Sequence, residues 1–492
     1  MDKEAHLLLR LVPSRLVSSK SQLVPFAVAA ALLCVASATR ADDWKTGTLE
    51  PRLQAILDSR DLRGADVGAL AVDADSGAVL FAHEPDREMI PASNQKLLTA
   101  LAAAAEFGPT HRFVTEVRAG AAPDAEGRVP WLAVRGSGDP TLTSEQWWRL
   151  AADLRRLGVR HVAGPVWFDA SAFDSESWHP AWGQTSARAY HAPVAALSAN
   201  YGAYAVVVVP GAAGEPARVR VDPPVPYLRV MNQARTGAEG SKATLTLSRK
   251  AGAGIERVIV TGSLAAGAEP EVFWRSVLDP VGYAASVFAM QLEANDIGVD
   301  GAVAAGVAPT SGVLLHEFEG KDMGEVLRLL GKYSSNVIAE SLLKAMSARA
   351  FGGPGTFEGG AEAMRSRLEG LGLPLDHAKL VDGSGLARGN RVTPRLMVAA
   401  LRTVRGSFEF GPEIVASLPI AGGDGTMSER AEGAAGRVRA KTGLLTGVAT
   451  LSGYVQMANG RVAAFSFLVN DFEHGAPAAR RAGDRFVEAL AR

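Results

Sequence analysis

The chain has 492 residues with a formal net charge of −1, and 47% of the residues are hydrophobic. A chain of that length can form two or three domains with sizeable cores. The near-neutral charge argues against the basic patch or stripe that nucleic-acid binding usually needs, so we expect no nucleic-acid partner.

The N-terminus is typical of an export signal. Basic residues precede an apolar stretch at 23–35, and Ala36-Ser37-Ala38 forms an A-x-A cleavage pattern. The apolar stretch is too short to span a bilayer comfortably. We therefore expect a signal peptide over 1–38, cleaved near Ala38, and an exported, periplasmic protein. An uncleaved membrane anchor is the alternative.

The residues available for chemistry are restricted by composition. The single cysteine, Cys34, lies inside the predicted signal, so a cleaved chain has no thiol for a disulfide or a nucleophile. Lipid attachment there is disfavoured by the bulk of Leu33. The nine histidines show no HxH or HExxH spacing. We expect no metal and no cofactor, and look instead to serine, lysine, histidine and carboxylates.

Ser93 and Lys96 are the first candidate pair. The sequence around them predicts a helix that begins near Ser93 and ends at Gly108. Lys96 then lies one turn after Ser93 on the same face. A lysine whose pKa is lowered by burial or by a second cation can take a serine proton. A backbone N–H at the helix start can stabilise an oxyanion. The alternative is a capping serine followed by a solvated lysine.

A second S-x-x-K occurs at Ser341 and Lys344. This copy lies in the interior of a predicted helix, 337–351, with no cap or turn before it. A serine in the middle of a helix tends to bond its own backbone. We interpret the second copy as structural.

Ser334-Ser335-Asn336 lies between two predicted helices, one covering 323–330 and the other beginning just after the tripeptide. One interpretation is a simple capping turn, with Ser335 or Asn336 as the cap. In the functional interpretation, Ser334 relays a proton and the Asn336 amide holds a substrate amide. Another S-x-N occurs at Ser198-Ala199-Asn200.

Lys441-Thr442-Gly443 precedes alternating segments split by a turn at 458–460, which predicts an antiparallel hairpin. A lysine at the start of an edge strand can bind a carboxylate and lower the pKa of a neighbouring lysine. Thr442 adds a hydroxyl donor, and Gly443 lets a substrate backbone approach closely. A second K-T-G, at residues 45–47, precedes a helical run and is interpreted as coincidental.

S-x-x-K, S-x-N and K-T-G, in this order, are the motifs of penicillin-binding proteins and serine β-lactamases. The chain resembles the class C low-molecular-weight penicillin-binding proteins, a family of D-alanyl-D-alanine carboxypeptidases and endopeptidases. The resemblance runs from about Leu49 to the C-terminus. Six segments carry it: PASNQKLLTALAA, GSGDPTL, YHAPVAALSANYGA, VDGSGLARGNRVTP, LPIAGGDGTM and RAKTGLLTGV.

The resemblance implies an α/β (α+β) fold, in which a central antiparallel sheet is flanked by helices and carries nested insertions. The stretch between the first two motifs is more than twice as long as that between the second and third, and too long for a loop. We expect a discontinuous transpeptidase-like catalytic domain over 44–112 and 313–492, an inserted α/β domain over 113–203 and 266–312, and a nested β-rich domain over 204–265.

The resemblance also implies the catalytic roles. Ser93 would attack the carbonyl between the last two D-alanines of a peptidoglycan stem peptide, and Lys96 would accept its proton. Ser334 would relay a proton to the leaving amine, and Asn336 would help to hold Lys96 and the substrate. β-Lactam antibiotics would be covalent inhibitors.

Substrate binding is assigned in the same way. Lys441 and Thr442 would bind the terminal carboxylate beside Gly443, and the backbone N–H groups of Ser93 and Leu444 would form the oxyanion hole. The family usually has Ser or Thr where this chain has Leu444. A side-chain contact to the substrate carboxylate is thereby lost, which would weaken carboxypeptidase activity or favour cross-linked peptides.

Two other functions stay open, a serine β-lactamase or esterase on the same scaffold and a catalytically weak peptidoglycan-binding or scaffold protein. Asp382, Arg391 and Asp424 match family segments, and we interpret each as fixing a turn or a buried salt link. The sequence leaves open whether the chain forms a homodimer or contacts a membrane surface peripherally.

Overall fold

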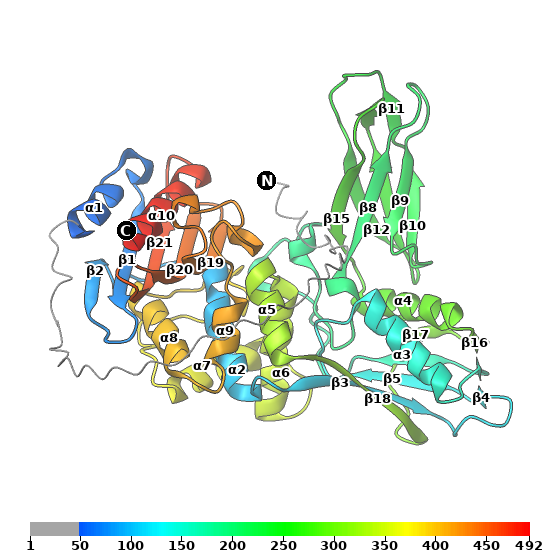
Figure 1. Ribbon diagram of the computed structural model, residues 1–492. Helices are drawn as coiled ribbons and strands as arrows, with labels where there is room; N and C mark the ends of the chain where they lie inside the picture. The colour runs from blue at the N-terminus through cyan, green and yellow to red at the C-terminus, as the bar shows by residue number, and fades with distance from the viewer. Residues whose placement is uncertain (1–48) are drawn as a thin grey trace, which may run out of the picture.

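The computed structural model describes residues 49–492. The predicted signal over 1–38 and the K-T-G copy at 45–47 lie outside the described residues. Two regions lie beside each other in Figure 1: a sheet wrapped in helices, which contains both ends of the described chain, and an insertion that extends away from it.

The first region is built on a five-stranded antiparallel sheet in the order β19-β20-β21-β1-β2. The N-terminal strand β1 pairs with β21 from the C-terminal part of the chain. This arrangement and the flanking helices confirm the expected fold class. The strands are β1 Asp66–Asp73, β2 Val79–His83, β19 Val438–Leu445, β20 Val448–Gln456 and β21 Val462–Asn470.

Helices cover both faces of this sheet, which explains why its central strands are apolar on both sides. In β1, Ala69 and Ala71 pack into the core beneath α1 Leu49–Leu57 and α10 Ala476–Ala491, whereas Leu70 and Val72 pack into the opposite core. The helices of the second layer are α2 Gln95–Phe107, α5 Met323–Tyr333, α6 Asn336–Phe351, α7 Phe357–Gly370, α8 Pro394–Gly406 and α9 Gly411–Ser417. Gly108, with φ of 79°, ends α2 where the sequence predicts.

The insertion contains a second five-stranded sheet, in the order β17-β7-β5-β3-β18. Its core includes the packed rings of Trp147, Phe168 and Phe288. The helices are α3 Ser144–Arg156 and α4 Pro280–Ala294. The strands of this sheet are β3 Arg112–Ala119, β5 Leu132–Gly136, β7 Val166–Asp169, β17 Val303–Ala305 and β18 Val313–Asp322, and a small sheet beside it contains β4 Arg128–Val129, β6 His161–Val162 and β16 Gly298–Val299.

A β-rich part of the insertion projects away from its helices (Figure 1). At the base of this β-rich part, the buried Glu256 carboxylate accepts hydrogen bonds from the hydroxyls of Tyr204 and Tyr227 and from the Leu278 backbone. Its strands are β8 Ala203–Val209, β9 Arg218–Asp222, β10 Leu228–Asn232, β11 Arg235–Gly237, β12 Thr246–Ala251, β13 Glu256–Thr261, β14 Ser263–Ala265 and β15 Glu271–Ser276.

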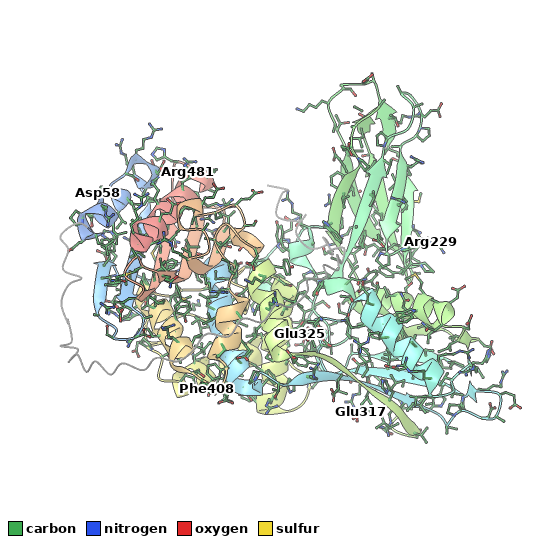
Figure 2. The ribbon with its side chains drawn as sticks, viewed as in Figure 1. Asp58, Arg229, Glu317, Glu325, Phe408 and Arg481 are labelled. Carbon is green, nitrogen blue, oxygen red and sulfur yellow. The ribbon has the colours of Figure 1, made fainter. Side chains whose placement is uncertain are left out.

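Two strands depart from the expected division of the chain. β18, which we assigned to the catalytic domain, pairs with β3 in the sheet of the insertion. In Figure 2, Glu317 on β18 accordingly lies far from Arg481 on α10. β15, assigned to the α/β part, pairs with β8 of the β-rich part. The strands that enter and leave an insertion meet at its base, and this long-range pairing is not encoded in local sequence patterns. The remaining domain boundaries stay predictions.

No helix within residues 49–492 combines the length and apolar character needed to cross a bilayer.

Candidate active site

Ser93 lies in a short 3-10 turn, Ala92–Asn94, directly before α2. The helix itself therefore begins at Gln95, slightly later than the sequence suggests. Ala92 has φ of 46°, a left-handed conformation that is uncommon for residues other than glycine and often accompanies functional sites. Ser93 is half-buried while its neighbours are buried, so the turn presents its hydroxyl at the end of the helix.

Lys96 is 1% exposed, and its ammonium nitrogen has three oxygen neighbours. Lys96 Nζ lies 3.0 Å from Ser93 Oγ, 2.7 Å from Asn336 Oδ1 and 2.7 Å from the Ser384 carbonyl. Burial lowers the pKa of Lys96 to about 7, although the carboxyls of Asp382 and Glu340 oppose the shift. The alternative of a solvated lysine is wrong.

An ammonium group could donate to all three oxygens, but the neutral amine, the form that acts as a base, can also make these contacts. A neutral lysine has two N–H donors and one lone pair. The Asn336 and Ser384 oxygens can only accept, so they take the two donors. The lone pair is then left for the Ser93 hydroxyl, whose proton it can remove.

A second serine and lysine face this pair. Ser334 ends α5 in the left-handed conformation, with φ of 57°, and its Oγ accepts a 2.8 Å hydrogen bond from Lys441 Nζ. Lys441 is 1% exposed. The sequence predicts Lys441 at the start of a strand, but the residue lies in the middle of β19. The strand begins at Val438 and pairs with β20 as a hairpin of its own. Ser335 caps α6, as one sequence interpretation proposed.

Asn336 connects the site to the insertion. While Oδ1 accepts from Lys96, its Nδ2 donates to the Tyr190 carbonyl at 2.8 Å. Tyr190 belongs to the 3-10 turn Ala189–His191 of the insertion. The insertion therefore helps to hold Asn336, which in turn contacts Lys96.

The K-T-G strand lies against the turn that carries Ser93. A Cβ atom on Gly443 would come within 2.2 Å of Thr450 Oγ1 and 3.0 Å of the Ser93 backbone nitrogen. Thr450 Oγ1 in turn donates to the Pro91 carbonyl at 2.8 Å. When the Asn94 amide is oriented to satisfy both Lys441 and Ser452, its nitrogen donates to the Lys441 carbonyl at 2.8 Å. The close approach of the Thr450 hydroxyl and of the Ser93 turn therefore leaves no room for a side chain at Gly443.

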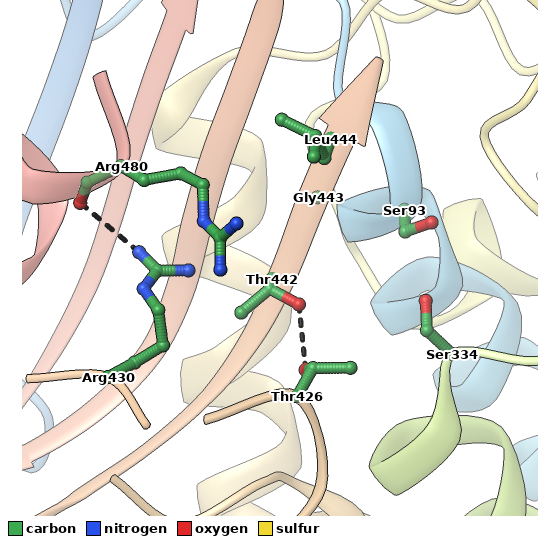
Figure 3. Close-up of a pocket in the computed structure, with 8 residues that line it drawn as sticks. All are labelled: Ser93, Ser334, Thr426, Arg430, Thr442, Gly443, Leu444 and Arg480. Atoms are coloured by element: carbon green, nitrogen blue, oxygen red, sulfur yellow. Dashed lines mark hydrogen bonds between the residues drawn. The ribbon is translucent and has the colours of Figure 1, made fainter. Parts of the chain in front are cut away.

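A cavity of about 80 Å³ opens between these elements (Figure 3). Thr442 Oγ1 donates to Thr426 Oγ1 at 2.7 Å within it. Five of the eight residues assigned to the site from the sequence line the cavity, and the other three, Lys96, Asn336 and Lys441, are joined to them by hydrogen bonds, Asn336 through Lys96. The residues that line the cavity are Ser93, Ser334, Thr426, Arg430, Thr442, Gly443, Leu444 and Arg480.

Three of these residues were not predicted. Thr426 lies within LPIAGGDGTM, one of the segments that carry the family resemblance, so this segment could have indicated it. Arg430 and Arg480 follow no recognisable motif. They reach the cavity because α10 and the loop before β19 pack beside the sheet.

Two buried carboxyl groups support the loop that contacts Lys96. Glu340 accepts hydrogen bonds from the Gly383 and Ser384 backbones, and burial raises its pKa to about 8. Asp382 accepts from two backbone N–H groups of the same loop and from Trp182 Nε1. The structural interpretation of Asp382 agrees with these contacts.

The other two family-matched charges also have structural contacts. Arg391 donates to the backbone carbonyls of Arg388 and Asn390, which fixes a turn. Asp424 pairs with Lys332 and accepts from the Ile420 backbone.

The second copies of two motifs lie elsewhere. Lys344 is buried against the Asp174 carboxylate, and Asn200 bonds to Ser144 and Tyr283 inside the insertion. Over residues 49–492, no group of three histidine, cysteine, aspartate or glutamate side chains is arranged to hold a metal ion.

The fold and the Ser-Lys arrangement together define a class of active-site-serine enzymes. Comparison with known proteins agrees with this class. Residues 49–492 match the model of the D-Ala-D-Ala carboxypeptidase 3 (S13) family. A D-alanyl-D-alanine carboxypeptidase from Actinomadura sp. (strain R39) is 37% identical over 451 residues, which cover 88% of this chain and 82% of that protein.

The structural comparison gives the same result. The crystal structure of penicillin-binding protein 4 from Haemophilus influenzae superposes with a TM-score of 0.76 at 28% identity, covering 89% of this chain and 98% of that one. A structure of the same protein complexed with a novel β-lactam superposes with a TM-score of 0.72 at 27% identity, with the same coverage. This chain belongs to the D-Ala-D-Ala carboxypeptidase 3 (S13) family. The predicted family and enzyme class, a serine-type D-alanyl-D-alanine carboxypeptidase, are confirmed.

Proposed function

We propose that Ser93 is the nucleophile with which this enzyme hydrolyses D-alanyl-D-alanine stem peptides or the cross-links of peptidoglycan. One observation carries the proposal: Lys96 Nζ is buried 3.0 Å from Ser93 Oγ and has a pKa lowered to about 7. A buried lysine with a pKa near 7 has a substantial neutral fraction at neutral pH and is a suitable base for a serine.

In the acylation step, Ser93 Oγ attacks the carbonyl carbon of the penultimate D-alanine while Lys96 takes its proton. A carbon–oxygen bond forms, and the carbonyl oxygen becomes an oxyanion. The backbone N–H groups of Ser93 and Leu444 stabilise this charge, each worth about 3 kcal/mol in comparable sites. The tight packing of Gly443 on the Ser93 turn supports this pairing of donors.

The leaving amine receives its proton through Ser334. The carbon–nitrogen bond breaks, and Ser334 Oγ gives a proton to the departing nitrogen. Lys441 Nζ, which donates to Ser334 Oγ at 2.8 Å, supplies the replacement proton. Asn336 holds Lys96 in place and, with its amide, orients the substrate backbone. Lys441 and Thr442 form the side of the site that faces the substrate carboxylate.

Hydrolysis of the ester completes the cycle. A water molecule takes the position of the leaving amine, attacks the acyl carbon and gives a proton through Ser334 to Lys441. The bond between the acyl carbon and Ser93 Oγ then breaks, the carboxylic acid is released, and Ser93 Oγ takes back the proton held by Lys96. β-Lactams acylate Ser93 by the same first step, but the amine stays tethered to the acyl group. The complex of the Haemophilus influenzae relative with a β-lactam supports this inhibition.

The setting proposed for the enzyme is the periplasm, after removal of the signal peptide at 1–38. The export pattern in the sequence supports this location. The substrate is then the peptide part of the cell wall, and no metal or cofactor takes part in any step of the proposed mechanism.

The proposal is tested by intact-protein mass spectrometry after incubation with benzylpenicillin. We expect a covalent adduct on the wild type and none on Ser93→Ala. The matched control is Ser341→Ala, which alters the other S-x-x-K and should still be acylated. Release of D-alanine from a diacyl-L-lysyl-D-alanyl-D-alanine peptide should follow the same pattern. A folded wild type that forms no adduct, or an adduct that survives in Ser93→Ala, contradicts the proposal.

A further inference from the structure

The cavity beside Ser93 contains two arginines, Arg430 and Arg480, that the mechanism above does not use. In Figure 3 both guanidinium groups lie on the side of the cavity opposite Ser93, and that of Arg480 extends toward Thr442. Arginine is well suited to bind a carboxylate, because its planar fork can donate two parallel hydrogen bonds.

Arg430 already has a counter-ion. Its guanidinium contacts the Asp484 carboxylate at 2.8–3.0 Å and donates to the Arg480 carbonyl at 3.2 Å. Arg430 is 9% exposed, so these contacts fix it as part of the wall. Asp484 stands one turn after Arg480 on α10 and is the nearest acidic residue along that helix, but its carboxylate is held by Arg430.

Arg480 is different. Within residues 49–492, its guanidinium makes no hydrogen bond and no ion pair, although it lines a cavity and is only partly exposed. Asp484 is therefore the counter-ion of Arg430 alone, and the cavity keeps the positive charge of Arg480. A partly buried cation without a counter-ion favours the binding of an anion.

The other polar side chains around the cavity already make hydrogen bonds within the protein. Lys441 Nζ is directed to Ser334 Oγ and the Thr442 carbonyl. The Thr442 hydroxyl donates to Thr426. Leu444 has no polar side-chain atom. Among the residues that line the cavity, Arg480 is therefore the cation whose donors are free.

We infer that Arg480 binds the α-carboxylate of the D-amino acid that leaves the substrate. The inference rests on the proposed function and deepens it. Such a carboxylate occurs on the terminal D-alanine of a stem peptide, and also on a D-configured cross-linking residue whose carboxyl is not amidated. Arg480 holds this group by two charge-assisted hydrogen bonds and so selects substrates in which the leaving amine carries a neighbouring carboxylate.

The test compares ligands with and without the carboxylate. The rate of acylation is measured by mass spectrometry with benzylpenicillin and with its methyl ester, on the wild type, Arg480→Gln and Arg481→Gln. Arg481 is the matched control, because it adjoins Arg480 on α10 but faces Asp61 at the outer surface. We expect Arg480→Gln to slow acylation by the acid by about 10- to 100-fold, the range for hydrogen bonds between charged groups, and to leave the ester rate unchanged.

Further variants and a peptide sharpen the result. Arg480→Lys keeps the charge but loses the fork, so its preference for the acid should be intermediate. Arg481→Gln should behave as the wild type with both ligands. If Arg480→Gln slows the acid and the ester equally, or slows neither, the inference is overturned.

Failure of the proposed function gives a different pattern. A wild type that is acylated by benzylpenicillin but releases no D-alanine from the peptide contradicts the proposed hydrolysis. The acid and ester rates then still decide the role of Arg480. A wild type that neither ligand acylates overturns both proposals.

Discussion

Lys96 and Lys344 occupy the same position in two copies of the S-x-x-K motif, and both side chains are almost completely buried, at 1% and 0% exposed. Their partners differ. Lys96 contacts a hydroxyl, an amide oxygen and a backbone carbonyl, none of which is charged. Lys344 contacts the Asp174 carboxylate and the Glu176 carbonyl, and its ammonium lies 4.0 Å from the centre of the Phe357 ring.

Burial lowers the pKa of both lysines, but the surroundings of Lys344 oppose the shift at close range. Asp174 and the Phe357 ring favour the ammonium form. The carboxyls that favour a charged Lys96, those of Asp382 and Glu340, act without a hydrogen bond to it, and its pKa falls to about 7. The same motif therefore produces a base in one place and a structural ion pair in the other.

The largest effect should come from removing the amine of Lys96. We expect Lys96→Met to slow acylation of Ser93 by about 10²- to 10⁴-fold, the typical contribution of a positioned general base. Lys344→Met, normalised to folded protein, should be acylated at the wild-type rate. Stopped-flow or gel measurement of labelling by fluorescent penicillin gives both rates. Equal losses in the two variants would show that the comparison is wrong.

Stability should respond in the opposite order. Lys344→Met leaves the partly buried Asp174 carboxylate without its cation, which should lower the free energy of unfolding by about 2–3 kcal/mol. Lys96→Met should lower it less. The reason is that burial lowers the pKa of Lys96 from 10.5 in the unfolded chain to about 7 in the folded protein. At neutral pH the buried lysine therefore lowers the free energy of unfolding. This loss of stability diminishes as the pH rises from about 7 toward 10.5. Chemical denaturation of the two variants at pH 7 compares them directly.

A smaller effect on acylation is expected from substituting glycines that pack against the two S-x-x-K motifs, Gly443 against the Ser93 turn and Gly355 against Lys344. Gly443→Ala would place a Cβ 2.2 Å from Thr450 Oγ1 and should slow acylation by about tenfold by displacing the strand from the Ser93 turn. Gly355→Ala would place a Cβ 2.1 Å from the Lys344 carbonyl and should reduce stability alone. A Gly355 variant with the larger catalytic loss would argue against the assigned site.

Much of the site could be predicted from the sequence because its chemistry is carried by short motifs. Ser93 and Lys96 are one helical turn apart, so their contact is local. The contacts that make Lys96 a base are not local: Asn336 and Ser384 come from distant segments, and only the folded chain brings their oxygens to the amine. Arg480 carries no motif at all.

The fold shows the same limit. The hairpin of β20 and β21 follows from alternation around the turn at 458–460, and the N-cap of α6 follows from Ser335. The pairing of β18 with β3 joins segments about 200 residues apart, and local periodicity does not determine such a partner. For this reason the expected division at 313 does not follow the pairing of β18 with β3.

The pH dependence of Ser93 acylation tests the central claim, that Lys96 is a neutral base in the folded protein. Only the unprotonated amine accepts a proton, so the rate with benzylpenicillin should rise by about tenfold per pH unit below the pKa and level off above pH of about 7. Stability at each pH is checked by circular dichroism. A rate that keeps rising toward the ordinary lysine pKa of 10.5, or that does not change across neutral pH, would contradict the account.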